Sequence, residues 1–402
     1  MASLVLMCGL PFSGKSTRAE KLKHDDYRNR RCTILSIDKM RELFPTARED
    51  TLYEKLIQKI DDIIKNDETV IVDEPNITFK QRKRILNGIH YEAYIKAFIM
   101  NTPYEICLER LRLYNEKNPN QQIVEATLRD AYEKFEIPFE GEGFNEININ
   151  HSARPNCSDR YLNEMETIAK NFNQDNKHHT QLLGDHMNTV EKYIYDNESD
   201  YVLRQAGKYH DVGKIFTRSY KEGDKNAHYY NHANIGTYNL MCYCGLFDEQ
   251  YGDRFYNHKK TLDWLFYINN HMKLHNDSSP DLKYYISNDK WHKLKLLYDA
   301  DCYRPDDNAK EDDTTTKQEE KPKNKIKFQT LTKNPAEIYK GPDYYVLDEP
   351  TTPNVGYWRP TPSVQWLYAD DVPAIRVDDQ VTINRQPVND VDWTVFGNDL
   401  PV

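Results

Sequence analysis

The stretch Gly9-Leu-Pro-Phe-Ser-Gly14-Lys15-Ser16-Thr17, called the phosphate loop below, decides the fold of the first part of the chain. It matches the spacing GxxxxGK[ST] and directly follows an apolar run, Leu4–Cys8, that we expect to be a buried strand. Its glycines let backbone amides curl around phosphate oxygens, and a helix beginning near Lys15 adds the positive end of its dipole. The alternative is a chance glycine-rich turn, but the flanking strand and helix favour nucleotide binding.

In this pattern the lysine reaches the β- and γ-phosphates of a nucleotide, and the hydroxyl after it binds Mg²⁺. The expected cofactors are therefore ATP, or another nucleoside triphosphate, and Mg²⁺. The residues expected to bind the nucleotide are Gly9, Ser13, Gly14, Lys15, Ser16 and Thr17.

Length and composition indicate several domains in one chain. The 402 residues and 47.6 kDa favour two or three domains, and 38% hydrophobic residues suffice for buried cores. A mean hydropathy of -0.87, with no apolar run near the roughly 18–20 residues that span a bilayer, predicts no membrane segment. The apolar start has no preceding Lys or Arg, which argues against a signal peptide, and seven cysteines without a CxxC pair fit a reducing cytoplasm.

The net charge of -10 excludes a protein that is basic overall. It does not exclude a local basic groove that binds nucleic acid. Short apolar runs alternate with amphipathic stretches over residues 1–152, which predicts an α/β domain with a parallel sheet. Residues 160–304 read as all-α, 305–327 as a charged linker, and 328–402 as a β-rich appendage. The expected strands of the first domain are Leu4–Cys8, Thr33–Ser36, Thr69–Asp73, Tyr94–Met100 and Glu146–Ile149.

Two segments after the second and third strands carry acids that suit phosphoryl transfer. In Ser36-Ile-Asp38-Lys-Met-Arg41, Asp38 could accept the proton of an attacking hydroxyl and Arg41 could hold an acceptor phosphate. The alternative is that Asp38 caps a helix while Arg41 is solvated. In Asp73-Glu-Pro-Asn76, Asp73 would lie near the Mg²⁺ ion, and Asn76 could contact substrate or the phosphate loop.

Arg110 and Arg112 follow in a predicted helix, where they could close over the triphosphate as a lid. On surface helices, arginines are more often solvated. The phosphate loop, the S-x-D-x-x-R and D-x-x-N segments and the lid arginines, in this order, resemble the polynucleotide-kinase-like P-loop phosphotransferases. The resemblance covers residues 1 to about 150. It implies transfer of a γ-phosphoryl group to a 5′-hydroxyl end, with Asp38 as general base and Arg41 as clamp on the acceptor phosphate.

Histidines and aspartates in the second zone are spaced for a metal site. An adjacent His210-Asp211 pair, followed by Val-Gly-Lys214, has histidines upstream and downstream and an Asp299-Ala-Asp301 run near the end. Imidazole and carboxylate ligands suit divalent transition metals, which activate water toward phosphorus. The alternative is that each histidine is structural. The expected ligands are His186, His210, Asp211, His232, His271 and Asp301.

This zone resembles the HD-domain phosphohydrolases over about residues 170–304. The resemblance implies one metal on His186, His210, Asp211 and Asp301, and a second ion if His232 and His271 also bind. Asp211 would be catalytic, and Mn²⁺, Co²⁺ or Ni²⁺ is expected at the site. Asp299 competes with Asp301 as the closing ligand, while His228, His258 and His275 are expected at the surface.

Together the resemblances predict a bifunctional end-processing enzyme like the HD–polynucleotide-kinase proteins of RNA repair, which often place the HD domain first. It would phosphorylate a 5′-hydroxyl and hydrolyse a 3′-end (2′,3′-cyclic or 2′/3′) phosphate, with RNA ends as favoured partners and an RNA ligase downstream. The alternatives are a small-molecule kinase fused to a nucleotide hydrolase and a nucleotide-regulated binding module. The aromatic appendage could stack on bases, but its acid excess favours docking on the HD domain or homo-oligomer assembly.

Overall fold

The computed structural model describes most of the chain before residue 305. It covers residues 1–28, 30–150, 158–176, 181–244, 247, 249–251, 255–275 and 282–304, with the short strands β10 (Phe328–Gln329), β11 (Tyr344–Val346) and β12 (Trp358–Pro360). The expected linker 305–327 lies outside the described residues, as does the appendage 328–402 apart from these strands. No helix in the described part is long and apolar enough to cross a bilayer.

The described residues before 305 fall into two compact units. Unit 1 holds Met1–Leu162 and Thr237–Leu262, and unit 2 holds Asn163–Gly236 and residues 263–304. Helices α7, α11 and α12 each contribute residues to both units. In unit 1, the hydroxyl of Tyr238 on α11 donates to the carbonyl of Thr102 over 2.6 Å.

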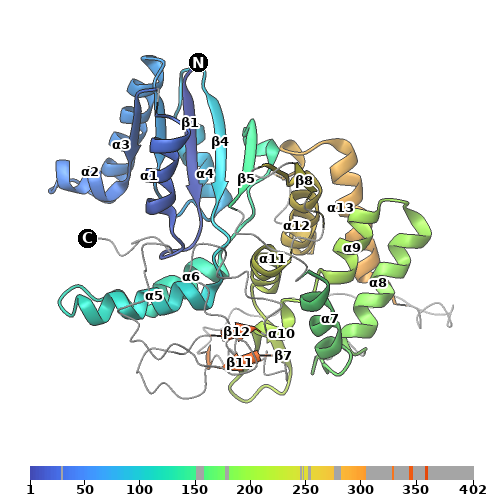
Figure 1. Ribbon diagram of the computed structural model, residues 1–402. Helices are drawn as coiled ribbons and strands as arrows, with labels where there is room; N and C mark the ends of the chain where they lie inside the picture. Colours follow the sequence, from blue (N-terminus) through green and yellow to red (C-terminus); the bar gives the residue numbers. More distant parts are fainter. Residues whose placement is uncertain are drawn as a thin grey trace, which may run out of the picture. The chain divides into compact units, whose positions relative to one another are not determined.

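Unit 1 is built around a five-stranded parallel sheet with the strand order β2-β3-β1-β4-β5 (Figure 1). Each strand begins and ends within one residue of its predicted position, so the α/β prediction is confirmed here. The apolar runs form strands because they are short, rich in β-branched residues and bounded by polar sequence. The strands are β1 (Ser3–Cys8), β2 (Cys32–Leu35), β3 (Thr69–Val72), β4 (Tyr94–Ile99) and β5 (Glu146–Ile149).

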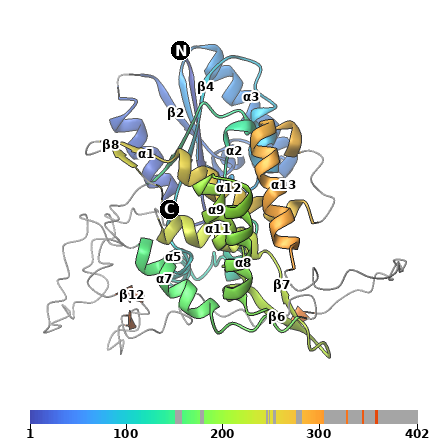
Figure 2. The ribbon, with the colours of Figure 1, turned by 90° about the vertical axis from the view of Figure 1, so that its right-hand side faces the viewer.

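Helices cover both faces of this sheet. The chain moves outward from β1 to β2 and then back to β3, so right-handed crossovers place α1 and α3 on opposite faces. Figure 2 shows these two helices on either side of the strands. Val5 and Met7 of β1 pack against Ala19 and Leu22 of α1 in a buried core. The helices are α1 (Lys15–Asp25), α2 (Ile37–Leu43), α3 (Glu49–Lys65), α4 (Phe79–Leu86), α5 (Tyr104–Lys117), α6 (Glu125–Glu133) and the 3-10 helix η1 (Glu140–Glu142).

A buried ion pair joins α4 to the 3-10 helix η1. Arg82 and Glu142, both with 0% exposed side chains, form two parallel hydrogen bonds of 2.7 Å. The third guanidinium nitrogen of Arg82 donates to the carbonyls of Asn76 (3.0 Å) and Glu136 (2.9 Å). One side chain therefore fixes the loop that follows β3, where candidate site residues lie.

Replacing Arg82 with Met is expected to lower the free energy of unfolding of unit 1 by about 3–5 kcal/mol, because Glu142 would stay buried without its partner. Hydrogen exchange of the β1 amides measures this change. The matched control is Arg112→Met, which breaks the exposed pair between Arg112 and Glu125 and should cost little. Equal losses in the two variants would contradict the assignment of Arg82.

The second zone is mainly helical, but the all-α expectation is wrong in detail. Strands β6 (Arg218–Lys221) and β7 (Ala227–Tyr229) form an antiparallel pair, and so do β8 (Glu249–Tyr251) and β9 (Phe255–Asn257). Helices α8, α9 and α13 of unit 2 pack on one another (Figure 1). The helices are α7 (Ser158–Ala169), α8 (Leu183–Asn197), α9 (Tyr201–Tyr209), α10 (Lys214–Thr217), α11 (His232–Tyr243), α12 (Lys259–Asn270) and α13 (Asn288–Cys302), with the 3-10 helices η2 (His271–Lys273) and η3 (Leu282–Tyr284).

Candidate functional site

The phosphate loop joins the end of β1 to the start of α1, as predicted. Gly14 precedes the helix with φ 96°, a left-handed conformation that favours glycine and turns the chain into α1. Lys15 is 8% exposed, and its Nζ donates to the Leu10 carbonyl over 2.8 Å. Ser13 is buried, whereas Ser16 is exposed on the first turn of the helix. The loop therefore has the strand–loop–helix geometry that presents backbone amides to a phosphate.

Neighbouring strand ends hold this loop from both sides. The amide of Gly9 donates to the Pro75 carbonyl over 2.9 Å, and Nδ2 of Asn76 donates to the Met7 carbonyl over 2.9 Å. From the β4 side, the Thr102 hydroxyl donates to the Ser13 carbonyl over 2.6 Å. Asn76 is 3% exposed, so it acts here as a brace of the loop.

Asp38 lies in the first turn of α2, with its side chain 84% exposed at the carboxyl edge of the sheet. The helix is capped by Ser36, whose side chain accepts from the Lys39 amide, so the alternative that Asp38 is the cap is wrong. Arg41 pairs with Asp38 and also with Glu49 at 3.1 Å. The acid and the arginine are therefore adjacent, as their spacing predicts.

Glu74 is a residue that sequence reasoning missed. Its carboxylate accepts a hydrogen bond from the Ile37 amide at the start of α2, which ties the loop after β3 to the helix that carries Asp38. Burial raises the pKa of Glu74 to about 7, against the lowering effect of the Ile37 amide. Asp73, which is predicted to lie near Mg²⁺, directly precedes Glu74. The backbone amide of Asp73 donates to the Leu35 carbonyl. The neighbouring Pro75 and Asn76 gave no sign that Glu74 would be buried.

The two candidate lid arginines have different surroundings. Arg110 of α5 is 8% exposed, and its guanidinium donates to the Phe12 carbonyl of the phosphate loop over 3.0 Å. Arg112 is exposed and pairs with Glu125 of α6 at 2.7 Å. The structure therefore brings only the first of them to the phosphate loop.

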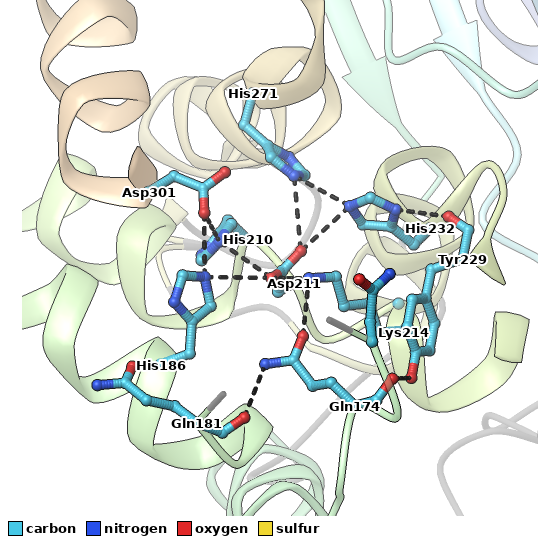
Figure 3. A network of polar contacts seen from close by, with 12 residues as sticks. Gln174, Gln181, His186, His210, Asp211, Lys214, Tyr229, His232, His271 and Asp301 are labelled. Carbon is cyan, nitrogen blue, oxygen red and sulfur yellow. Dashed lines mark hydrogen bonds and ion pairs between the residues drawn. The ribbon is translucent and has the colours of Figure 1, made fainter. Parts of the chain in front are cut away.

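In unit 2, six predicted ligands meet in one buried place, called the histidine–aspartate cluster below (Figure 3). Each comes from a different segment: α8, the end of α9, the turn after it, the start of α11, the start of η2 and the end of α13. Their ligand atoms form two groups that share Asp211, and within a group they lie within 4.8 Å of one another. The first group is His186, His210, Asp211 and Asp301; the second is Asp211, His232 and His271.

The two carboxylate oxygens of Asp211 face different groups. Its Oδ2 lies 3.3 Å from Nε2 of both His186 and His210. Its Oδ1 lies 3.1 Å from Nε2 of His232 and 3.7 Å from Nε2 of His271. One carboxylate therefore stands between two sets of nitrogen atoms.

A close backbone approach makes this convergence feasible. A Cβ atom on Gly213, two residues after Asp211, would lie 1.9 Å from the His232 carbonyl oxygen. Only glycine allows the turn after α9 to pack so closely on the start of α11. The two segments therefore bring Asp211 and His232 together.

The backbone fixes which ring nitrogen faces the cluster. Nδ1 of His210 lies 2.8 Å from the Gly207 carbonyl, and Nδ1 of His271 lies 2.7 Å from the Ile268 carbonyl. Nδ1 of His232 lies 2.8 Å from the carbonyl of Tyr229. Since a carbonyl can only accept, each Nδ1 carries the proton, and Nε2 of a neutral ring presents a lone pair to the cluster.

The second group therefore brings acceptor atoms together. Nε2 of His232 and Nε2 of His271 are 3.1 Å apart, and both face Oδ1 of Asp211. Burial lowers the pKa of His271 to about 4, which keeps its ring neutral. Two lone pairs and a carboxylate oxygen at this range repel one another unless a cation lies among them. These residues fit a divalent metal.

The first group also favours positive charge. Burial raises the pKa of the Asp211 carboxyl, but Lys214, His210 and His186 together lower it well below its usual range, so the carboxylate stays ionised. Burial lowers the pKa of His210, yet Asp211 and Asp301 oppose this and raise it to about 10. Nε2 of His210 lies 3.3 Å from Oδ2 of Asp211 and 3.4 Å from Oδ1 of Asp301. Imidazole nitrogens with carboxylates are a donor set for transition metals.

The structure also decides between competing residues. Asp301, not Asp299, faces the cluster, with Oδ1 3.0 Å from Nε2 of His186. Its other oxygen lies 2.9 Å from Nε2 of His275, which is exposed as expected. His258 is 6% exposed, so its expected surface position is wrong. Nothing in the spacing of these histidines indicates which are buried.

Comparisons with known proteins give a family match and a similar solved structure. A comparison with curated proteins found no match. A solved structure of Chaetomium thermophilum Kti12 in complex with ADP-AlF3 is similar over 40% of this chain and 94% of that chain, at 15% identity and a TM-score of 0.31. The family model described as an AAA domain matches residues 4–138. With the parallel sheet and the phosphate loop, this match supports a nucleotide-binding, P-loop kinase-like fold for these residues.

Proposed function

We propose that the chain is a bifunctional nucleic-acid end-processing enzyme. Its N-terminal domain transfers the γ-phosphoryl group of ATP to a 5′-hydroxyl end. Its histidine–aspartate cluster is an HD-type metal centre that hydrolyses 3′-end phosphates, including 2′,3′-cyclic ones. RNA ends are the favoured substrates, since ribonuclease cleavage leaves both of these termini, and an RNA ligase would use the corrected ends.

One observation carries the hydrolase half of this proposal. Nε2 of His232, Nε2 of His271 and Oδ1 of Asp211 face one another while Nδ1 of each ring lies at a backbone carbonyl, an arrangement that a cation would stabilise. A structural histidine would instead donate its Nε2–H to an acceptor. The first group adds His186, His210 and Asp301 around the other oxygen of Asp211.

The six side chains would hold one or two divalent transition metals, Mn²⁺, Co²⁺ or Ni²⁺. Such a metal supplies Lewis acidity and makes water a nucleophile near neutral pH. The protein itself excludes bulk water, because every member of the cluster is at most 7% exposed. Lys214, 2.6 Å from Oδ2 of Asp211, adds a positive charge beside the place where a phosphate would react.

The kinase half rests on the carboxyl edge of the sheet. Lys15 would bind the β- and γ-phosphates, with Ser16 and Asp73 near Mg²⁺. Asp38 would accept the proton of the attacking hydroxyl while that oxygen bonds to the γ-phosphorus and ADP leaves. Arg110 is placed at the phosphate loop, where it can stabilise the charge that develops on the transferred group.

A test of the kinase half compares acceptors for labelled ATP. We expect transfer to a 5′-hydroxyl oligoribonucleotide and little to a panel of nucleosides, because Arg41 beside Asp38 suits an acceptor that already bears a phosphate. Arg41→Ala should then raise the KM of the oligonucleotide more than the KM of ATP, with no penalty on a nucleoside. Transfer to nucleosides alone would favour a small-molecule kinase, and equal losses on both acceptors would reduce Arg41 to a structural residue.

A further inference from the structure

Gln174 is a fully buried polar residue beside the histidine–aspartate cluster, and the proposed chemistry does not use it. Its side-chain carbonyl accepts from Nζ of Lys214 over 3.0 Å, and its amide donates to the Gln181 carbonyl over 3.2 Å. Its backbone carbonyl accepts from the Tyr229 hydroxyl over 2.5 Å. Figure 3 shows Gln174 between the lysine and the tyrosine.

The lysine connects Gln174 with the first group. Nζ of Lys214 is 2.6 Å from Oδ2 of Asp211, and the side chain is only 5% exposed. A buried ammonium needs hydrogen-bond acceptors for its protons. Gln174 supplies a neutral acceptor opposite Asp211, so the lysine can bond to both and keep its charge at the carboxylate.

The tyrosine connects Gln174 with the second group. The Tyr229 carbonyl lies 2.8 Å from Nδ1 of His232 and thereby fixes the tautomer and the direction of that ring. The hydroxyl of the same tyrosine is held by the Gln174 backbone. Both groups of the cluster therefore depend on contacts that meet at one residue.

We propose that Gln174 is a positioning residue for the whole cluster. Its side-chain carbonyl holds Lys214 on Asp211, and its backbone carbonyl holds the tyrosine that orients His232. This inference rests on the proposed metal-centre function. The competing explanation is that Gln174 only fastens the chain near Gln181, to which its amide donates.

Two substitutions separate these explanations. Gln174→Glu and Gln174→Met both remove the amide that donates to Gln181, but only glutamate keeps an acceptor for Lys214. We expect Gln174→Met to weaken Mn²⁺ binding by about 10- to 100-fold, and Gln174→Glu to stay close to wild type. Mn²⁺ affinity is measured on the full chain by titration calorimetry. Hydrolysis of an aryl phosphate gives kcat and KM separately, and thermal melting verifies folding.

A separate variant tests the contact between Tyr229 and Gln174. Tyr229→Phe removes the hydroxyl that donates to Gln174 and also contacts Arg218, and should lower Mn²⁺ affinity because His232 loses part of its support. Tyr230→Phe is the matched control, since that neighbouring ring is 46% exposed and should leave Mn²⁺ binding unchanged.

The outcomes are distinguishable. A wild-type chain that binds no Mn²⁺ would overturn the metal-centre function, and this inference with it. If the wild type binds Mn²⁺ but Gln174→Glu and Gln174→Met bind equally well or equally poorly, the metal-centre function stands and Gln174 has no positioning role through Lys214. Equal Mn²⁺ affinities in Tyr229→Phe and Tyr230→Phe would show that Gln174 does not position His232 through Tyr229.

Discussion

Asp211→Ala is expected to abolish metal-dependent phosphoester hydrolysis while transfer of phosphate from ATP stays near wild type. Both oxygens of Asp211 face ligand nitrogens, so its loss takes a charge from both groups of the cluster at once. The proposed kinase site consists of other residues and does not include this carboxylate. The hydrolase activity is measured with an aryl phosphate and Mn²⁺, and the bound metal by mass spectrometry. The kinase activity is measured by transfer of labelled phosphate from ATP.

The matched control is Asp224→Ala, which removes a carboxylate that pairs with His228 outside the cluster. This variant should retain both metal and hydrolysis. Full hydrolysis by an Asp211→Ala protein that contains no transition metal would contradict the assignment of the cluster.

Lys15→Ala and Asp38→Ala are each expected to lower phosphoryl transfer by about 100-fold or more, for different reasons. Lys15 is proposed to bind the triphosphate, so its loss should impair the use of ATP with every acceptor. Asp38 is proposed to act on the acceptor hydroxyl, and its carboxylate is exposed, so ATP affinity should survive its loss. Initial rates with an oligonucleotide acceptor, and calorimetric titration with a non-hydrolysable ATP analogue, separate the two effects.

Exposed residues of the same helices serve as controls for this pair. Lys21→Ala removes a positive charge from α1, as Lys15→Ala does, and Glu42→Ala removes a negative charge from α2, as Asp38→Ala does. Neither control should change the rate of phosphoryl transfer or the affinity for ATP. A loss of ATP affinity with retained transfer in Asp38→Ala would reverse the role given to that residue.

The strands and the phosphate loop of unit 1 are predictable from the sequence because they depend on local patterns. Apolar runs and the GxxxxGK[ST] spacing are visible in a few residues each. The strand order is not visible, since each crossover can join any free edge of the sheet. The strands β6 and β7 are missed because Arg218–Lys221 has no alternation of apolar and polar residues.

The cluster is predictable in composition but not in detail. Asp299 and Asp301 are two residues apart, which on a helix is a rotation of about 200°, so only one of them can face the cluster. Which one does so depends on how α13 packs, and local sequence does not contain this information. Glu74 and Gln174 are missed for the same reason, because their importance comes from burial and from partners far along the chain.

The rings of His210 and His271 are each oriented by a carbonyl three residues earlier in their own segment, and the same holds for His232. The direction of these ligand atoms is thus a local property of single turns of backbone. Sequence changes in surrounding segments that contact neither these carbonyls nor Gln174 would alter what reaches the cluster without turning these nitrogens away. If the proposed metal centre lies here, its substrate could diverge during evolution while its ligand directions are inherited unchanged.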